Sequence, residues 1–327
     1  MGRQTPTNLW AVVLAAGEGS RMAPLTRALY GHEVPKQFAA LDGDRTLLQR
    51  TMDRIAPLTP PERTVVVVSS AYEELARTQL ADYPGVEIVT QPLNLGTAVG
   101  ILLPLAHVLA RDPRAHVAIY PSDHHIRRAD PFCEAVERSV RVAPLSESGV
   151  SLLGAAAERP AVDLGWIVRG NRLGGQLDRA WQVNRFVEKP PEPLAMLLLG
   201  TGGLWNTMVV SGRARALWEL ARRHVPEQTR AFDAYLPQVG HHNARQARDL
   251  LYRLLLPADF SREILQVARG LAVVPLIDSG WFDCGTPERL FEWLRATPEM
   301  HGLLQRLEGA LARAGARKAP AVTVAAA

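Results

Sequence analysis

The sequence predicts an α/β protein with a Rossmann-like, mostly parallel central sheet that carries helices on both of its faces. The first observation is a set of short β-branched runs, each the length of one strand, at residues 10–14, 64–69, 86–90 and 116–120. The second is that helix-length segments rich in Ala, Leu, Arg and Glu separate these runs. Such alternation indicates βαβ units, whose right-handed crossovers bring the functional loops to the carboxyl ends of the strands.

The second half of the chain is less regular and predicts a smaller β-rich region. Turns rich in Gly and Pro interrupt the strands expected there, at residues 150–155, 181–188 and 204–210. From residue 213 onward the pattern is mainly helical, with one apolar strand at 271–276 and amphipathic stretches at 287–295 and 302–313. We therefore expect one domain over residues 1–300, with halves at about 1–148 and 149–300, and a C-terminal helix with a disordered tail over 301–327.

Composition excludes several classes of protein. With 327 residues, 47% of them apolar, the chain can bury a substantial core. Cys133 and Cys284 lie far apart and lack the spacing of metal ligands, which argues against a disulfide framework or a zinc site and favours a reducing, cytoplasmic setting. The apolar runs are too short to span a bilayer, so no membrane partner is expected. A net charge of +4 without a basic run predicts no nucleic-acid partner.

A glycine-rich loop directly follows the first predicted strand. Residues 11–27 read AVVLAAGEGSRMAPLTR, so that Gly17, Gly19 and Ser20 precede Arg21. Glycines let backbone N–H groups approach phosphate oxygens, and the arginine supplies further donors. The loop lacks the Gly-Lys-Ser/Thr of a P-loop, and Met22 replaces the third glycine of a dinucleotide fingerprint. A tight strand-to-helix turn without a ligand is the other interpretation.

This loop and the segment Val34-Pro35-Lys36-Gln37-Phe38 together resemble the signature of sugar-1-phosphate nucleotidyltransferases, and the PKQF form resembles mannose-1-phosphate guanylyltransferases. The resemblance covers about residues 9–290 and implies the nucleotide-diphospho-sugar transferase type of fold. It implies that Arg21 and Lys36 hold phosphate. A later segment, 91–98, resembles the family's base-contacting loop. The residues that the resemblance assigns to the nucleotide are Leu14, Ala15, Ala16, Gly17, Gly19, Ser20, Arg21, Gln91, Gly96, Thr97, Ala98 and Asp123.

Two aspartates lie in further segments that match this family in the same order. Asp123 follows the strand that ends at residue 120, and Asp283 lies in the segment Trp-Phe-Asp-Cys-Gly. The resemblance places Mg²⁺ between these two carboxylates, and two carboxylates suit an ion that keeps several waters. A turn or helix cap is the alternative role for a lone aspartate. His124 and His125 point in opposite directions on an extended segment, so we expect no metal role for them, and Cys284 is expected to be a buried, inert thiol.

The sugar side is also implied by resemblance. Three short segments, Gly-Trp-Ile at 165–167, Phe-Val-Glu-Lys-Pro at 186–190 and Trp-Asn at 205–206, match the family's motifs. They assign sugar-phosphate binding to Gly165, Glu188, Lys189 and Asn206. Asp259 is expected either near the active site or at a helix N-cap.

The reaction implied is attack of a hexose 1-phosphate on the α-phosphorus of a nucleoside triphosphate, with GTP and mannose 1-phosphate as substrates and GDP-mannose and pyrophosphate as products. Gln91 departs from the acidic residue common in guanylyltransferases, and its amide also suits uracil or thymine. A glucose-1-phosphate uridylyl- or thymidylyltransferase therefore stays open, as does a regulatory subunit that binds nucleotide sugars without turnover. A homodimer is also left open.

Overall fold

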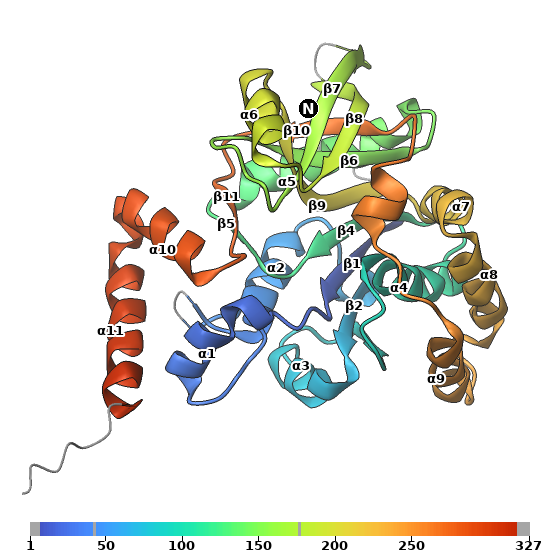
Figure 1. Ribbon diagram of the computed structural model, residues 1–327. Helices are drawn as coiled ribbons and strands as arrows, with labels where there is room; N and C mark the ends of the chain where they lie inside the picture. Colours follow the sequence, from blue (N-terminus) through green and yellow to red (C-terminus); the bar gives the residue numbers. More distant parts are fainter. Residues whose placement is uncertain (1–6, 42–43, 176–177, 319–327) are drawn as a thin grey trace, which may run out of the picture.

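The computed structural model describes residues 7–41, 44–175 and 178–318. Nine strands form one sheet in the order β3-β2-β1-β4-β9-β6-β10-β8-β7 (Figure 1). The expected strand positions are confirmed to within about one residue at most ends. The strands are β1 (Leu9–Ala15), β2 (Thr64–Ser69), β3 (Glu87–Gln91), β4 (His116–Pro121), β6 (Val150–Ala156), β7 (Gly165–Leu173), β8 (Ala180–Glu188), β9 (Leu204–Arg213) and β10 (Ala272–Leu276).

The sheet is mixed, which corrects the expectation of a mostly parallel sheet. Its N-terminal part is parallel as predicted, because β1 pairs in parallel with both β2 and β4, and β2 pairs in parallel with β3. Strand β9 then runs antiparallel between β4 and β6, and β8 runs antiparallel to both β7 and β10. The β7–β8 connection is too short for a crossover helix, so these two strands can pair only as a hairpin.

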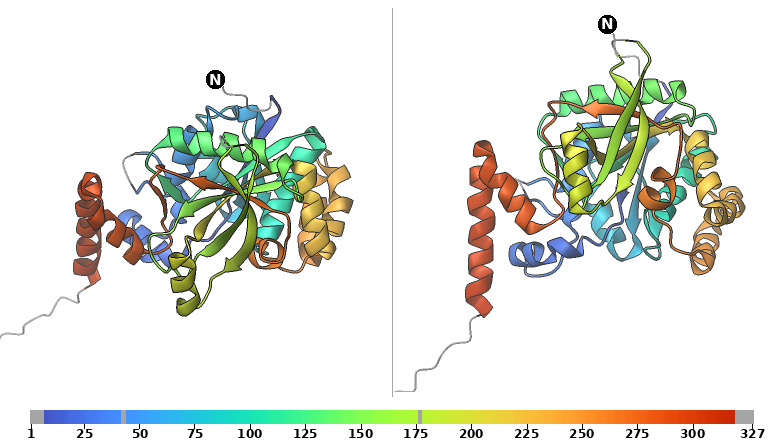
Figure 2. Two further views of the ribbon diagram at one scale, coloured as in Figure 1. Left: turned by 90° about the horizontal axis from the view of Figure 1, so that it is seen from above. Right: turned by 45° about the horizontal axis from the view of Figure 1, so that its top comes forward.

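Helices cover both faces of the sheet, as expected (Figure 2). One face carries α4 and the helices α7 to α9, whose apolar residues join one large core with Val12 and Val65. The other face carries α2, α3 and α5 over a second core that includes Val13 and Val66. Successive strand residues therefore alternate between two cores. The bounds are α2 (Leu47–Ile55), α3 (Glu73–Gln79), α4 (Thr97–Arg111), α5 (Ala129–Val142), α7 (Ala214–His224), α8 (Pro226–Tyr235) and α9 (Ala244–Leu254).

A small antiparallel ribbon lies outside the main sheet. It consists of β5 (His124–Ile126) and β11 (Trp281–Asp283), and it places Asp283 opposite His124. Three-residue strands carry too little alternation to be predicted, and neither was. The ribbon joins two segments that are about 160 residues apart in sequence, so it fixes the relative position of Asp123 and Asp283.

The C-terminal helices form a third core with the N-terminal helix. Helices α10 (Pro287–Ala296) and α11 (His301–Lys318) stand beside α1 (Ala23–Tyr30) in Figure 1. Leu290, Leu294 and Leu307 pack there with Met22 and Leu25. Helix α11 lies where a C-terminal helix was expected, and the expected disordered tail, residues 319–327, lies outside the described residues. Helix α6 (Glu192–Gly200) instead covers β7 and β9 near the sugar-side motifs.

No helix among the described residues combines the length and the apolar character needed to cross a membrane.

Candidate active site

A cavity of about 420 Å³ opens where the carboxyl ends of β1, β3 and β4 meet β7, β8 and β9. The register between β1 and β4 explains part of this meeting, because Leu14 lies opposite Pro121 and both strands end there. Most residues that the sequence assigned to substrates line this one cavity. They are Leu14, Ala16, Gly17, Arg21, Lys36, Gln91, Gly96, Thr97, Asp123, Gly165, Glu188, Lys189, Asn206 and Asp283.

Four of the assigned residues do not line the cavity. Ala15 and Ala98 are buried in the two cores, with exposed fractions of 1% and 0%. The N–H group of Ala98 donates to the carbonyl of Ala258, so it is already used within the protein. Gly19 and Ser20 lie in the turn between the loop and α1, outside the cavity lining.

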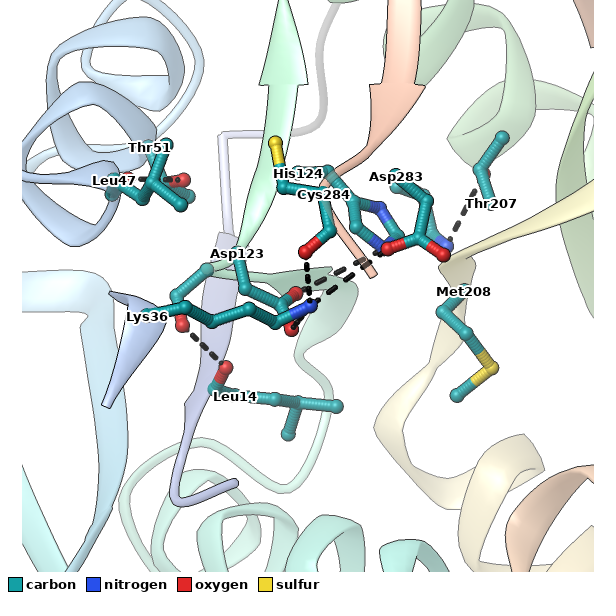
Figure 3. A network of polar contacts seen from close by, with 12 residues as sticks. Leu14, Lys36, Leu47, Thr51, Asp123, His124, Thr207, Met208, Asp283 and Cys284 are labelled. Atoms are coloured by element: carbon teal, nitrogen blue, oxygen red, sulfur yellow. Dashed lines mark hydrogen bonds and ion pairs between the residues drawn. The ribbon is translucent and has the colours of Figure 1, made fainter. Parts of the chain in front are cut away.

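The ammonium group of Lys36 joins the two aspartates at the centre of the cavity (Figure 3). Its Nζ lies 2.9 Å from Oδ2 of Asp123 and 3.7 Å from Oδ1 of Asp283, and it donates to the carbonyl of Cys284 at 3.2 Å. His124 lies beside the same carboxylates, with Nε2 at 3.8 Å from Asp123 and 3.9 Å from Asp283. The two predicted metal ligands and the predicted phosphate-binding lysine therefore form one cluster.

The cluster fixes the charges of its members. Burial opposes ionisation of Asp123, but the nearby Lys36 ammonium outweighs it and lowers the pKa of Asp123 to about 2. Burial likewise opposes the charge on Lys36, yet Asp123 and Asp283 raise its pKa above the usual value. Burial lowers the pKa of His124, so this imidazole is neutral at pH 7. Cys284 is buried, as expected, and burial raises the pKa of its thiol to about 12, which disfavours the reactive thiolate.

We expect the Asp123–Lys36 pair to give the protein a distinct stability loss in acid. A carboxylate whose folded pKa is depressed stabilises the fold above its unfolded value of about 4, and this stabilisation disappears as the pH falls toward about 2. Urea unfolding in EDTA at pH 5 and pH 3 measures it. The free-energy difference between the wild type and Lys36→Met should shrink on acidification, and a difference that stays constant would contradict the pairing.

Arg289 on α10 contacts Oδ2 of Asp283, whereas Lys36 approaches Oδ1. Its Nη1 lies 3.3 Å from Oδ2 of Asp283 and donates to Oδ2 of Asp163 at 2.5 Å. A side chain at Gly285 would meet both partners, since a Cβ built there lies 3.0 Å from Nη1 of Arg289 and 3.0 Å from Oδ2 of Asp283. The Gly that follows Cys284 thus leaves room for this contact.

The glycine-rich loop approaches the Lys36 segment closely. Gly19 has φ +62°, and a Cβ there would lie 3.0 Å from the backbone nitrogen of Lys36. The side-chain amide of Gln37 donates to the carbonyls of Ala15 and Gly17 at 2.9 and 2.7 Å. These hydrogen bonds occupy the carbonyl oxygens of Ala15 and Gly17. A loop beside Arg21 whose carbonyl oxygens are already bonded favours contact with an anion.

The loop of residues 91–98 is tied to a distant segment at Ala258. Gly96 has φ +87° and ψ 170°, and a Cβ at this position would lie 2.4 Å from the carbonyl oxygen of Ala258. The carbonyl of Leu95 accepts from the N–H of Ala258 at 2.9 Å. The turn is also closed locally, because Oδ1 of Asn94 accepts from the N–H of Gly96.

Gln91 is the one assigned residue of this loop with an unused polar atom. The residue is buried at 4% exposure, it lines the cavity, and its Oε1 has no hydrogen-bond partner among the described residues. Gly100 leaves room for it, since a Cβ there would lie 3.4 Å from Oε1. A buried acceptor without a partner is costly unless a ligand supplies a donor.

The sugar-side residues gather on the opposite wall. A Cβ at Gly165 would lie 2.8 Å from Oε2 of Glu188, so glycine is needed for this approach. Nζ of Lys189 lies 3.4 Å from Oε1 of Glu188, and burial raises the pKa of that carboxyl. Asn206 is 5% exposed, and its Oδ1 accepts from the N–H of Met208. Asp259 lines the cavity and also caps the helix that follows it, so both expectations for it are confirmed.

Several lining residues were not singled out by the sequence for this cavity. Asp163 lines the cavity and lies two residues before the Gly165 motif, and its partner Arg289, which lies outside the lining, comes shortly after Asp283 on an amphipathic helix, but neither spacing marks a contact. Met208 was not predicted to line the cavity either. Its backbone has φ +56°, a conformation that is rare for a non-glycine residue and that the sequence does not indicate. The other unassigned lining residues are Val67, Asn94, Gly100, Pro121, His124, Leu164, Ser261 and Trp281.

Comparison with known proteins agrees with this geometry. The family model described as nucleotidyl transferase matches residues 10–299, nearly the whole chain. The chain belongs to the nucleotidyl transferase family. This chain is 30% identical to mannose-1-phosphate guanylyltransferase 2 of Escherichia coli O157:H7, and the match covers 66% of this chain and 45% of that relative. Mannose-1-phosphate guanylyltransferase of Escherichia coli K12 is 28% identical over 90% of the chain and 61% of the relative. The chain thus spans about half to three fifths of the length of these curated relatives.

Solved structures show the same fold in other nucleotidyl transferases. A crystal structure described as mannose-1-phosphate geranyltransferase from Thermus thermophilus matches with a TM-score of 0.74 and 28% identity, over 85% of this chain and 77% of that one. Inositol-1-phosphate CTP transferase from T. maritima matches with a TM-score of 0.53 and 15% identity, over 92% of this chain and 96% of that one, and shows the fold alone. The mixed sheet is therefore a nucleotide-diphospho-sugar transferase fold.

Proposed function

We propose that this nucleotidyl transferase joins GTP to mannose 1-phosphate and releases GDP-mannose and pyrophosphate. The observation that carries the proposal is the single cavity in which the glycine-rich loop, Lys36 and the two aspartates face Glu188 and Asn206. Relatives with 28–30% identity are named mannose-1-phosphate guanylyltransferases, which supports this pair of substrates. The two free cysteines suit a reducing compartment, and we place the enzyme in the cytoplasm with small molecules as its partners.

The two halves of the domain would divide the substrates between them. Residues 1–148 supply the nucleotide side, where Arg21 and Lys36 would grip the triphosphate and Gln91 would reach the base. Residues 149–300 supply the sugar side, where Lys189 would hold the sugar phosphate and Glu188 and Asn206 would bond hydroxyl groups. A compact ammonium group suits a phosphate dianion that must move during the reaction.

Asp123 and Asp283 fit a divalent metal ion, and we assign Mg²⁺ to them. Both carboxylates reach one ammonium group, so a single small cation can interact with both. Mg²⁺ prefers oxygen ligands, of which few come from the protein and the rest from water. Oxygens of the triphosphate and water would complete the set of ligands around the ion. When bound, the ion would neutralise phosphate charge.

The chain's own groups would act mainly by position and charge. Two polyanions must meet, and each close charge pair repels by about 1 kcal/mol in water and by more in a dry cleft. Arg21, Lys36 and Lys189 would offset this repulsion and align the sugar phosphate oxygen with the α-phosphorus, in line with departing pyrophosphate. The attacking phosphate is already ionised, so no general base is required, which agrees with a neutral, buried His124.

Gln91 favours one alternative substrate class. Its unpartnered Oε1 accepts a hydrogen bond from the N–H of guanine, and equally from the N3–H of uracil or thymine, while its amide nitrogen can donate to O4. A glucose-1-phosphate uridylyl- or thymidylyltransferase is therefore the second candidate. A binding subunit without turnover is less well supported, because Arg21, Lys36, Asp123, Lys189 and Asp283 are all present.

Pyrophosphate release tests these functions directly. The purified protein is assayed with Mg²⁺ and GTP, UTP, dTTP, ATP or CTP, each with mannose 1-phosphate and with glucose 1-phosphate. Release confined to GTP and mannose 1-phosphate is the expected result. A preference for UTP or dTTP would replace it with the second candidate, and no release with any pair would support the binding subunit.

Asn206→Ala should raise KM for the sugar phosphate about tenfold while changing kcat little. Its side chain lies on the sugar wall of the cavity, where a lost hydrogen bond weakens binding of the ground state and the transition state alike. Steady-state kinetics with varied sugar phosphate at saturating nucleotide measures the split. A change confined to KM for the nucleotide would contradict this placement.

A further inference from the structure

A second cavity, of about 310 Å³, is lined by residues of α2 and β5. It is rich in basic side chains. The lining residues are Arg45, Leu47, Arg50, Asp53, Arg54, His124, His125, Ile126, Arg127 and Ala129. Only His124 is shared with the substrate cavity. None of the four arginines has a role in the proposed reaction.

Arg54 is a buried cation without an acidic partner in the described part of the chain. Its exposed fraction is 8%, its Nη2 donates to Oγ1 of Thr51 at 2.7 Å, and its guanidinium lies 5.2 Å from the centre of the Phe132 ring. Its Nε is buried and has no acceptor among the described residues. Burial lowers its pKa to about 10. The ring and the carboxyl end of α2 offset part of the cost of burying this charge, but they leave donors unused.

Asp53, the only carboxylate among the described residues that line this cavity, is already engaged. Arg45 donates to both of its oxygens, from Nε at 3.1 Å and from Nη2 at 2.8 Å, and the Tyr83 hydroxyl donates to Oδ1 at 2.5 Å. Arg54 and Arg127 therefore meet no second carboxylate in the cavity lining. The cavity keeps an excess of positive charge next to a guanidinium that is nearly inaccessible to solvent.

We propose that this cavity binds a small phosphate-type oxyanion, either inorganic phosphate or the phosphate group of a monoester. Guanidinium groups match the geometry of phosphate oxygens and are weakly hydrated, so they bind phosphate well in a partly buried site. The anion would accept hydrogen bonds from Arg54 and Arg127 and supply the missing counter-charge. The site is separate from the substrate cavity and does not depend on which nucleotide or sugar the enzyme uses.

Calorimetric titration of the full chain with inorganic phosphate at low ionic strength tests the proposal. The wild type should bind phosphate saturably, and Arg127→Ala and Arg54→Met should each weaken that binding about tenfold or more. Arg128→Ala is the matched control, because Arg128 is the exposed neighbour of Arg127 and lies outside the cavity lining. It should bind phosphate as the wild type does. Arg127 is itself exposed, so Arg127→Ala keeps the test valid if Arg54→Met fails to fold.

Lys36→Ala separates this site from the substrate cavity. Phosphate binding at the second cavity should survive in Lys36→Ala. Binding that disappears in Lys36→Ala but persists in Arg127→Ala would overturn the proposal, because the anion would then occupy the substrate cavity. Equal weakening by Arg127→Ala and Arg128→Ala, or no saturable binding by the wild type, would also overturn it. A second titration uses glycerol 3-phosphate in place of inorganic phosphate. If glycerol 3-phosphate binds more tightly than inorganic phosphate, the site prefers a phosphate monoester; if it binds more weakly, the site prefers the free anion.

Discussion

Asp283→Ala should lower kcat by about 100- to 1,000-fold while leaving KM for the sugar phosphate nearly unchanged. Asp283 is held between Lys36 and Arg289, at 3.7 and 3.3 Å, so its carboxylate is fixed before substrates arrive. Groups preorganised around developing charge act mainly in the transition state, and removing one such group typically costs this much in rate. Initial rates of pyrophosphate release over a range of both substrates measure the effect.

Asp278→Asn is the control for this variant. Asp278 is exposed and lies five residues earlier in the same segment, and asparagine tolerates its φ of +55°. It should keep the wild-type rate. Lys36→Ala should resemble Asp283→Ala, because it removes the proposed phosphate-binding cation and also the internal partner of both aspartates. Unchanged kcat in both Lys36→Ala and Asp283→Ala would refute the assigned roles.

Gly96→Ala should destabilise the protein by about 3 kcal/mol or more and abolish nucleotide binding. Two costs add at this position. The backbone lies at φ +87° and ψ 170°, a region that only glycine adopts readily, and strain there costs about 1–3 kcal/mol. The new Cβ would also lie 2.4 Å from a backbone oxygen at Ala258, so the loop must move away from its partner segment. Urea unfolding and nucleotide titration measure the two effects.

Gly240→Ala separates the two costs. Gly240 has φ +84°, close to that of Gly96, but a Cβ there meets no atom within 4 Å. It should therefore show the backbone strain without the clash, a loss of about 1 kcal/mol, and normal nucleotide binding. If Gly96→Ala proved no more harmful than Gly240→Ala, the contact with Ala258 would have no importance for the loop.

The sequence predicted the parallel part of the fold better than the rest. Val65 to Val68 and the matching run in β1 are apolar on both faces, which is typical of a parallel sheet covered by two layers of helices. The sequence did not indicate that β9 runs antiparallel to its neighbours β4 and β6. Its residues are equally buried, and strand direction depends on the path of the connecting chain rather than on the residues themselves.

The residues of the site also fall into two groups: those that a short sequence motif marks, and those that only long-range contacts bring together. Lys36, Asp123 and Asp283 were found because each lies in a short motif that can be recognised in sequence. The contact of Arg289 with Asp163 and that of Gly96 with Ala258 join segments more than 120 residues apart, and no local pattern records such a pairing. The basic cavity beside α2 was not predicted for a related reason, because its four arginines belong to no motif and lie on two separate segments of the chain.

The β5–β11 ribbon has a consequence for a chain that is still being synthesised. The glycine-rich loop, Lys36 and Asp123 leave the ribosome before Asp283, which lies on β11 and emerges about 160 residues after its strand partner on β5. A fragment that ends before β11 therefore carries the proposed phosphate-binding cations with one aspartate and lacks the other. On the proposed roles, turnover requires that β11 has been synthesised and has paired with β5, so a product that ends before β11 would bind ligand at most and make no nucleotide sugar.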